Sequence, residues 1–96
     1  MLTIKKIENT VSKYGKKYGI EKVYLFGSYA KGEASDSSDV DLIIEKGRLK
    51  TYDDYCDLKF AIEDDLGKKV DLLTSDGVKP RFYELIKEDR ILLYGA

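Results

Sequence analysis

The chain has 96 residues, among them no histidine, a single cysteine (Cys56) and a single proline (Pro80). Without histidine it has neither a Ser-His-Asp triad nor a Cys-His pair, and a lone cysteine forms no internal disulfide. A zinc site built on histidine and cysteine is excluded for the same reason. Any bound metal ion must therefore be held by oxygen, which favours Mg²⁺, Mn²⁺ or Ca²⁺.

The sequence also lacks an excess of charge of one sign and long apolar runs. Charged residues make up 36% of the chain, yet the net charge is only −1. This balance is not that of a polybasic nucleic-acid binder, so we expect no nucleic-acid substrate. No apolar run approaches the roughly 20 residues of a membrane-spanning helix, and the N-terminus has no signal-peptide pattern. We therefore expect a cytoplasmic protein that does not contact a membrane.

The spacing of apolar residues predicts alternating helices and strands within one domain, residues 1–96. Helices are expected over 4–18, 28–31, 52–66 and 81–89, and strands over 23–26, 40–45, 69–73 and 91–94. This order indicates an α/β (α+β) fold, with a sheet of about four strands and helices packed on one side. The inward stripe of the third helix is expected to be Tyr52, Tyr55, Leu58, Ile62 and Leu66.

Three aspartates lie at or within the predicted strands. Asp39 and Asp41 leave the same face of a strand, about 6–7 Å apart, and Asp71 lies in the next strand along the chain. If those two strands are neighbours, the three carboxylates converge. Carboxylates that lie so near one another oppose each other's ionisation. A pair of bound divalent cations would remove this repulsion. Such two-metal sites serve phosphoryl and nucleotidyl transfer.

A second motif, Gly27-Ser28, lies where the first strand ends and a short helix is expected to begin. Glycine lets a phosphate approach the backbone closely, and serine adds a hydroxyl donor beside free backbone N–H groups. Either motif alone is common in turns and strand ends. Their combination is what favours a site for a polyphosphate.

The joint pattern resembles the nucleotidyltransferase superfamily related to DNA polymerase β. Ten residues separate Gly27-Ser28 from Asp39-Val40-Asp41, and the strand acid Asp71 follows later. The longer strings FGSYAKGEA and SDVDL are similar to those of its smallest branch, the minimal nucleotidyltransferases of prokaryotes. One difference is visible at Lys31, where members of the branch often have arginine. Lysine keeps the charge but loses the planar fork that grips a phosphate.

The resemblance implies a nucleotidyltransferase fold with a mixed β-sheet. It also implies that Asp39, Asp41 and Asp71 hold two Mg²⁺ ions, with Mn²⁺ as an alternative, and that Asp71 helps to deprotonate an acceptor hydroxyl. Gly27, Ser28 and Lys31 would bind the nucleotide, which is expected to be ATP. Whether Lys31 takes the role of that arginine is left open.

Larger members of the superfamily carry a second domain for the acceptor, so we expect another molecule to supply it here. Minimal nucleotidyltransferases commonly pair with a helical HEPN-family toxin, an RNase. The resemblance thus implies an antitoxin that adds AMP to a tyrosine of that toxin. Two alternatives remain open at this stage: modification of a small hydroxylated molecule such as an aminoglycoside, and neutralisation of the partner by binding alone. Homo-oligomer formation is also left open.

Overall fold

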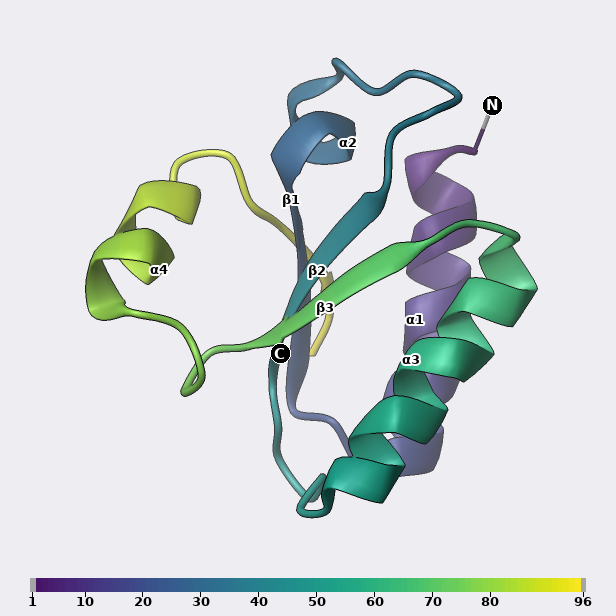
Figure 1. Ribbon diagram of the computed structural model, residues 1–96, viewed down its shortest axis with the longest axis vertical. Coiled ribbons are helices and arrows are strands. Elements are labelled where there is room, and N and C mark those ends of the chain that lie inside the picture. The colour runs from purple at the N-terminus through teal and green to yellow at the C-terminus, as the bar shows by residue number, and fades with distance from the viewer. Residues whose placement is uncertain (1, 96) are drawn as a thin grey trace.

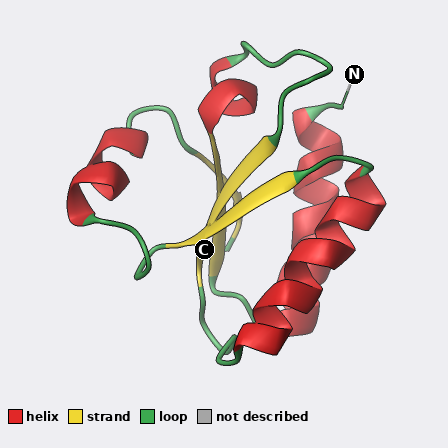
Figure 2. Cartoon of the chain, in the orientation of Figure 1, coloured by secondary structure: helices red, strands yellow, loops and turns green. Residues whose placement is uncertain are grey.

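Helices and strands alternate along the whole chain in the computed structural model, which describes residues 2–95 (Figures 1 and 2). The elements are α1 (Ile4–Tyr18), β1 (Lys22–Phe26), α2 (Gly27–Lys31), β2 (Val40–Glu45), α3 (Tyr52–Leu66), β3 (Val70–Thr74), α4 (Pro80–Ile86) and β4 (Ile91–Tyr94). The predicted order is confirmed, with most boundaries within one residue. The exception is α4, which ends at Ile86 rather than at residue 89 because the following residues, 87–89, form turns.

The four strands form one mixed sheet in the order β3-β2-β1-β4. β1 is antiparallel to both β2 and β4, whereas β2 and β3 are parallel. The parallel pair needs a long connection, and α3 supplies it as the crossover helix. The pairing brings the two acidic segments, which are distant in sequence, onto adjacent strands.

Residue choice explains where the two long helices begin and end. Thr3 caps α1 and Thr51 caps α3, and each hydroxyl accepts a hydrogen bond from a backbone N–H three residues later, at 3.2 and 3.1 Å respectively. These bonds satisfy amide donors that a helix start leaves unpaired. Gly19 and Gly67 follow the last turns in the left-handed conformation that ends many helices. The two helices contact each other, and Lys13 of α1 forms an ion pair with Asp65 of α3 at 3.3 Å.

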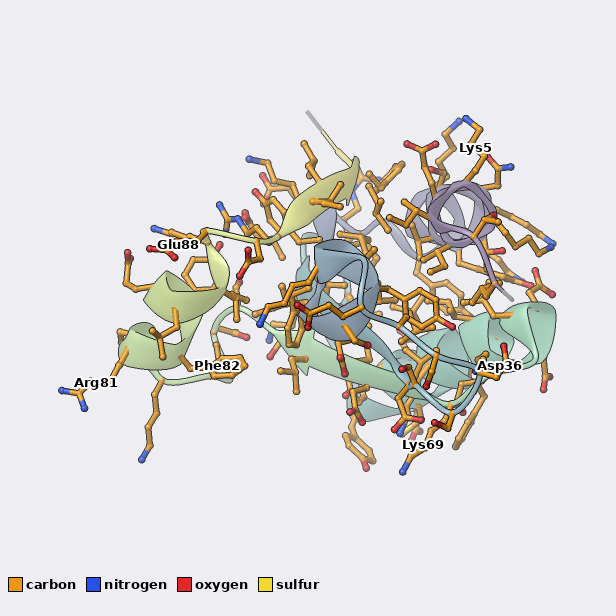
Figure 3. The ribbon with its side chains drawn as sticks, turned by 90° about the horizontal axis from the view of Figure 1, so that it is seen from above. Lys5, Asp36, Lys69, Arg81, Phe82 and Glu88 are labelled. Atoms are coloured by element: carbon orange, nitrogen blue, oxygen red, sulfur yellow. The ribbon has the colours of Figure 1, made fainter. Side chains whose placement is uncertain are left out.

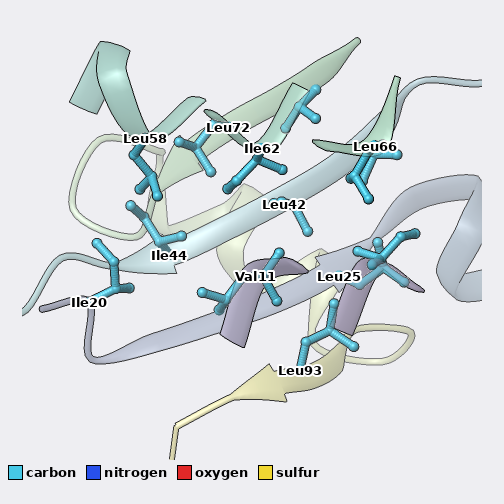
Figure 4. Packing of buried hydrophobic residues seen from close by; sticks show 14 of the residues in the cluster. Val11, Ile20, Leu25, Leu42, Ile44, Leu58, Ile62, Leu66, Leu72 and Leu93 are labelled. Atoms are coloured by element: carbon cyan, nitrogen blue, oxygen red, sulfur yellow. The ribbon is translucent and has the colours of Figure 1, made fainter. Parts of the chain in front are cut away.

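The hydrophobic core lies between the sheet and the α1–α3 layer (Figure 4). Every second residue of β1, β2 and β3 points into it, as the period of a strand requires. The fully or nearly fully buried members from these strands and from α3 are Val23, Leu25, Val40, Leu42, Ile44, Val70, Leu72, Leu58, Ile62 and Leu66. The other face of each strand is therefore free to carry polar side chains.

The fourth helix corrects the prediction that all helices cover one side of the sheet. α1 and α3 lie on one face, whereas α4 lies off the opposite face (Figure 1). Its contacts are those of that second face: the Phe82 ring meets the Phe26 ring of β1 at 5.9 Å in a T-shaped arrangement. The guanidinium of Arg90, just after α4, lies 4.0 Å from the centre of the Tyr24 ring. No residue of α4 is buried.

Tyr52 is a second correction, because it is not part of the inward stripe of α3. Its side chain is 76% exposed, and its ring stacks against Tyr55 at 6.0 Å. Tyr55 packs against the core and so already covers it at the first turn of the helix. Within residues 2–95, none of the helices combines the length and the apolar character that crossing a bilayer would require.

Candidate active site

A row of three side chains crosses the sheet on the face opposite the core. Phe26 of β1 is in register with Asp41 of β2, and Asp41 is in register with Asp71 of β3. Registered residues on neighbouring strands project from the same face. The structure thus places two of the sequence-predicted acids beside each other, with an aromatic ring on one flank. Asp71 is exposed and Asp41 is half-buried.

The Asp41 carboxyl has a raised pKa in this arrangement. Burial raises its pKa most, and the hydrogen bond with Asp71 and the charges of Asp71 and Asp39 raise it further, to about 6. The environment therefore opposes the ionised form of Asp41. A raised carboxyl pKa in a cluster of acids is typical of sites built for a cation or for proton transfer.

Asp39 lies one residue before β2, at the end of the loop that connects α2 to that strand. It acts on Asp41 through its charge. The loop is held by Lys68, whose ammonium group donates to the backbone carbonyls of Asp36 and Ser38, the latter at 3.2 Å. The backbone N–H of Val40 donates to the Lys69 carbonyl at 3.0 Å, which fixes the chain on the other side of Asp39.

Lys68 is a positioning residue that the sequence reading missed. Its partners are backbone carbonyls about thirty positions earlier in the chain, so no side-chain pattern could have shown the pairing. The signal available in the sequence was only a lysine next to Gly67, at the end of a helix. By holding the residues before Asp39, Lys68 fixes where the first acid of the site lies.

Gly27 is packed directly against Asp41. It opens α2 with a φ of 73°, and a Cβ built on it would lie 2.2 Å from the Asp41 Oδ2 atom. A side chain at this position is excluded on both counts, because L-residues rarely adopt such a φ and the space is taken by a carboxylate. Ser28 follows in the first turn of α2 and is partly exposed. Lys31, the last residue of α2, is exposed.

The outer edge of β3 is tied to α3, which holds Asp71 in place. The Val70 N–H donates to Glu63 Oε2 at 2.9 Å, and the Tyr55 hydroxyl donates to the Leu72 carbonyl. These two bonds bracket Asp71 along the strand. They also occupy backbone groups that an edge strand would otherwise leave unpaired.

The donor set suits a hard divalent cation. Asp39, Asp41 and Asp71 offer only carboxylate oxygens, which Mg²⁺ and Mn²⁺ prefer, and a cation would relieve the repulsion that raises the pKa of Asp41. In the structure as it stands, no group of three His, Cys, Asp or Glu side chains within residues 2–95 is arranged to hold a metal ion. The metal-binding roles of the three aspartates therefore stay predictions.

The sequence matches the family described as "Polymerase beta, Nucleotidyltransferase" over residues 5–96. A relative named "Putative protein adenylyltransferase MJ0435", from Methanocaldococcus jannaschii, is 40% identical over 76 residues, which cover 79% of this chain and 76% of that protein. The chain belongs to the nucleotidyltransferase family, and the resemblance drawn from Gly27-Ser28 and the three aspartates is confirmed at the level of the family.

Solved structures agree on the fold. One described as "Structure of putative minimal nucleotidyltransferase" superposes with a TM-score of 0.81 at 33% identity, covering 92% of this chain and 90% of that one. Another is of a tri-AMPylated Shewanella oneidensis HEPN toxin in complex with MNT antitoxin. It matches with a TM-score of 0.74 at 19% identity, covering 96% of this chain and 72% of that one, and at this identity the likeness concerns the fold alone.

Proposed function

We propose that the protein is an antitoxin that transfers AMP from ATP to a tyrosine hydroxyl of a HEPN-family RNase toxin. The observation that carries this proposal is the Asp41–Asp71 pair beside Gly27, in a chain of the nucleotidyltransferase family. Two further findings support the acceptor. A 40% identical relative is named "Putative protein adenylyltransferase MJ0435", and the fold recurs in an antitoxin complexed with an AMPylated HEPN toxin.

Asp39, Asp41 and Asp71 are the residues that would hold two Mg²⁺ ions, with Mn²⁺ as an alternative. When bound, such ions neutralise charge on the phosphates and lower the pKa of the attacking hydroxyl. Gly27 and Ser28 would bind the triphosphate through their backbone N–H groups, and Ser28 adds its hydroxyl. Lys31 adds a positive charge one turn further along α2.

The transfer itself makes one bond and breaks one. The tyrosine oxygen attacks the α-phosphorus of ATP, the bond between that phosphorus and the bridging oxygen to the β-phosphate breaks, and pyrophosphate leaves. Asp71, which is exposed on the outer strand of the acidic row, would accept the hydroxyl proton. AMP adds bulk and negative charge to the toxin, and both oppose the binding of RNA. We assign the reaction to the cytoplasm, which supplies ATP and Mg²⁺.

Incubation of the purified protein with ATP, Mg²⁺ and a HEPN partner tests the proposal. Intact-mass measurement should show the partner gaining one or more AMP units. The double variant Asp39→Asn, Asp41→Asn keeps the shape of both side chains and should transfer nothing. Transfer to an aminoglycoside but never to a partner protein would contradict the proposed acceptor. Cells protected equally well by the double variant would show that neutralisation works by binding and not by catalysis.

A further inference from the structure

A groove of about 290 Å³ lies beside the acidic row, between the end of β1, α2 and α4. Its volume is near the lower end of the range for small-molecule sites. Phe26 and Gly27 form one wall, and α4 supplies Phe82, Leu85 and Ile86 for the other. Gly27 and Lys31, which also line it, are already predicted to bind the nucleotide, whereas the apolar side chains of α4 have no role in the site described above.

The groove is continuous with the acidic site through two residues. Gly27 lines the groove and also packs against Asp41 Oδ2. Phe26 lines it as well, and it stands next to Asp41 in the row across the sheet. A ligand whose phosphates lie at Gly27 and Asp41 therefore has this groove as an immediate neighbour.

The wall from α4 is apolar but is not part of the core. Phe82 and Leu85 remain 37% and 68% exposed. Figure 3 shows Phe82 on the side of α4 that faces the rest of the molecule, whereas Arg81 points away from it. Exposed aromatic and aliphatic side chains beside a polar site are typical of a ligand-binding surface. The Phe26 and Phe82 rings meet edge to face, with their planes at 83°, so the two walls of the groove are in contact with each other.

Two charged side chains complete the lining, Lys31 and Asp89. The lysine suits the phosphate-bearing part of a ligand. Among the described side chains that line the groove, Asp89 is the one hydrogen-bond acceptor, and a carboxylate accepts but does not donate. An apolar slot with a carboxylate at its rim matches a flat aromatic ring that bears an amino group.

We propose that this groove binds the base of the nucleotide, with Phe82 and Leu85 packing on the ring and Asp89 accepting a hydrogen bond from its exocyclic amino group. The inference rests on the proposed function, since it assigns a place to part of the same substrate. It predicts a preference for ATP over ITP, because hypoxanthine has an oxygen where adenine has the amino group.

Photolabelling locates the base directly. The protein with Mg²⁺ is irradiated with 2-azido-ATP, digested with trypsin and analysed by mass spectrometry. Label that excess ATP suppresses is expected on the fragments 82–87 or 23–31. Suppressible label on fragment 51–59, which borders a separate hollow lined by Tyr52 and Tyr55, would overturn the proposal. So would the absence of any label that ATP suppresses.

Kinetics with matched variants test the contacts. Leu85→Ala is expected to raise KM for ATP about tenfold, because it removes an apolar side chain that would be buried against the base, with kcat little changed. Phe60→Ala removes another exposed apolar side chain, which lies on α3 and is 58% exposed, and should change neither. Asp89→Ala should remove most of the preference for ATP over ITP.

The outcomes separate this inference from the proposed function. If the wild-type protein transfers no AMP to any partner, the proposed function fails, while photolabelling still decides where the base binds. If transfer occurs and Leu85→Ala raises KM for the partner protein but not for ATP, the groove holds the acceptor and the inference is wrong.

Discussion

Gly27 and Asp41 are in such close contact that the first residue can have no side chain. A Cβ at position 27 would approach Asp41 Oδ2 to 2.2 Å and Asp41 Cγ to 3.0 Å, and the φ of 73° at Gly27 is itself unfavourable for any other residue. The glycine thus sets the position of a carboxylate as well as the path of the backbone. This relationship links the two sequence motifs in space.

Gly27→Ala is therefore expected to lower AMP transfer by about a hundredfold or more, since a displacement of about 1 Å in a reacting group can have that effect. Gly32→Ala is the matched control. Gly32 has a similar φ of 74°, but a Cβ there would meet nothing within 4 Å. Both variants carry the same backbone penalty, roughly 1–2 kcal/mol, and thermal unfolding measures it. Equal loss of activity in the two variants would contradict a role for the contact with Asp41.

The raised pKa of Asp41 predicts a dependence of stability on pH. In the metal-free protein the pKa of this carboxyl is about 6, above its ordinary value of 3.8. The folded chain therefore binds the proton more tightly than the unfolded chain does, and the free energy of unfolding should fall as pH rises from about 4 to 6. Above that range the contribution is constant and unfavourable. Urea denaturation at several pH values measures it, and Asp41→Asn should remove the decrease.

Asp71→Asn should lower the pKa of Asp41, because it removes a neighbouring negative charge. Carboxyl ¹³C NMR follows the titration directly. Asp76→Asn provides the control, since Asp76 is paired with Lys46 at 3.0 Å outside the acidic row. An unchanged titration of Asp41 in the Asp71→Asn protein would show that burial and the charge of Asp39, and not Asp71, raise its pKa. Mg²⁺ binding should weaken as pH falls through about 6, because the proton and the cation compete for one carboxylate.

Lys68→Ala should impair transfer by releasing the loop that precedes Asp39. We expect kcat to fall about tenfold, since misplacing a reacting group lowers the rate, and the free energy of unfolding to change by less than about 1 kcal/mol. Lys68→Arg keeps the charge and the donors and should restore most of the activity. Lys16→Ala, which changes an exposed lysine of α1, is the control. A loss of stability large enough to explain the loss of activity would assign Lys68 a merely structural role.

The Tyr29 hydroxyl predicts a stabilising substitution. Its side chain is only 4% exposed, and within the described residues the oxygen has no hydrogen-bond partner. A buried polar group without a partner costs about 1–3 kcal/mol. Tyr29→Phe should therefore raise the free energy of unfolding by about 1 kcal/mol without affecting transfer, whereas Tyr52→Phe, at an exposed position, should have no effect. A decrease in stability on Tyr29→Phe, measured by urea denaturation, would contradict this reading.

Local chemistry in the sequence predicted most of the fold. The spacing of apolar residues predicted all eight elements in their order, with most ends within one residue of those in the structure. Asp39 and Asp41 could be placed on one face of their strand because side chains alternate along a strand. Whether Asp71 lies beside Asp41 depends on the order of the strands, which the sequence did not determine. The structure shows that β2 and β3 are parallel neighbours.

Features that depend on tertiary contacts were missed. Nothing in the apolar pattern of α4 indicates which face of the sheet it covers, because it buries no residue. Its place follows from the contacts of Phe82 with Phe26 and of Arg90 with Tyr24. Tyr52 has the spacing of a core residue, but Tyr55 already fills that role. The hydrogen bonds of Lys68 to the loop before Asp39 depend on backbone geometry. The same is true of the groove beside Gly27.

The alternation along β2 and β3 restricts how this protein can change over evolutionary time. In Val40-Asp41-Leu42 and again in Val70-Asp71-Leu72, each acid lies between two buried aliphatic residues. Deleting or inserting a single residue in either strand would turn the carboxylate inward and the aliphatic residues outward. Substitutions can be tolerated one at a time, but a change of length here removes folding and chemistry together, so we expect length variation among related chains to be confined to the loops.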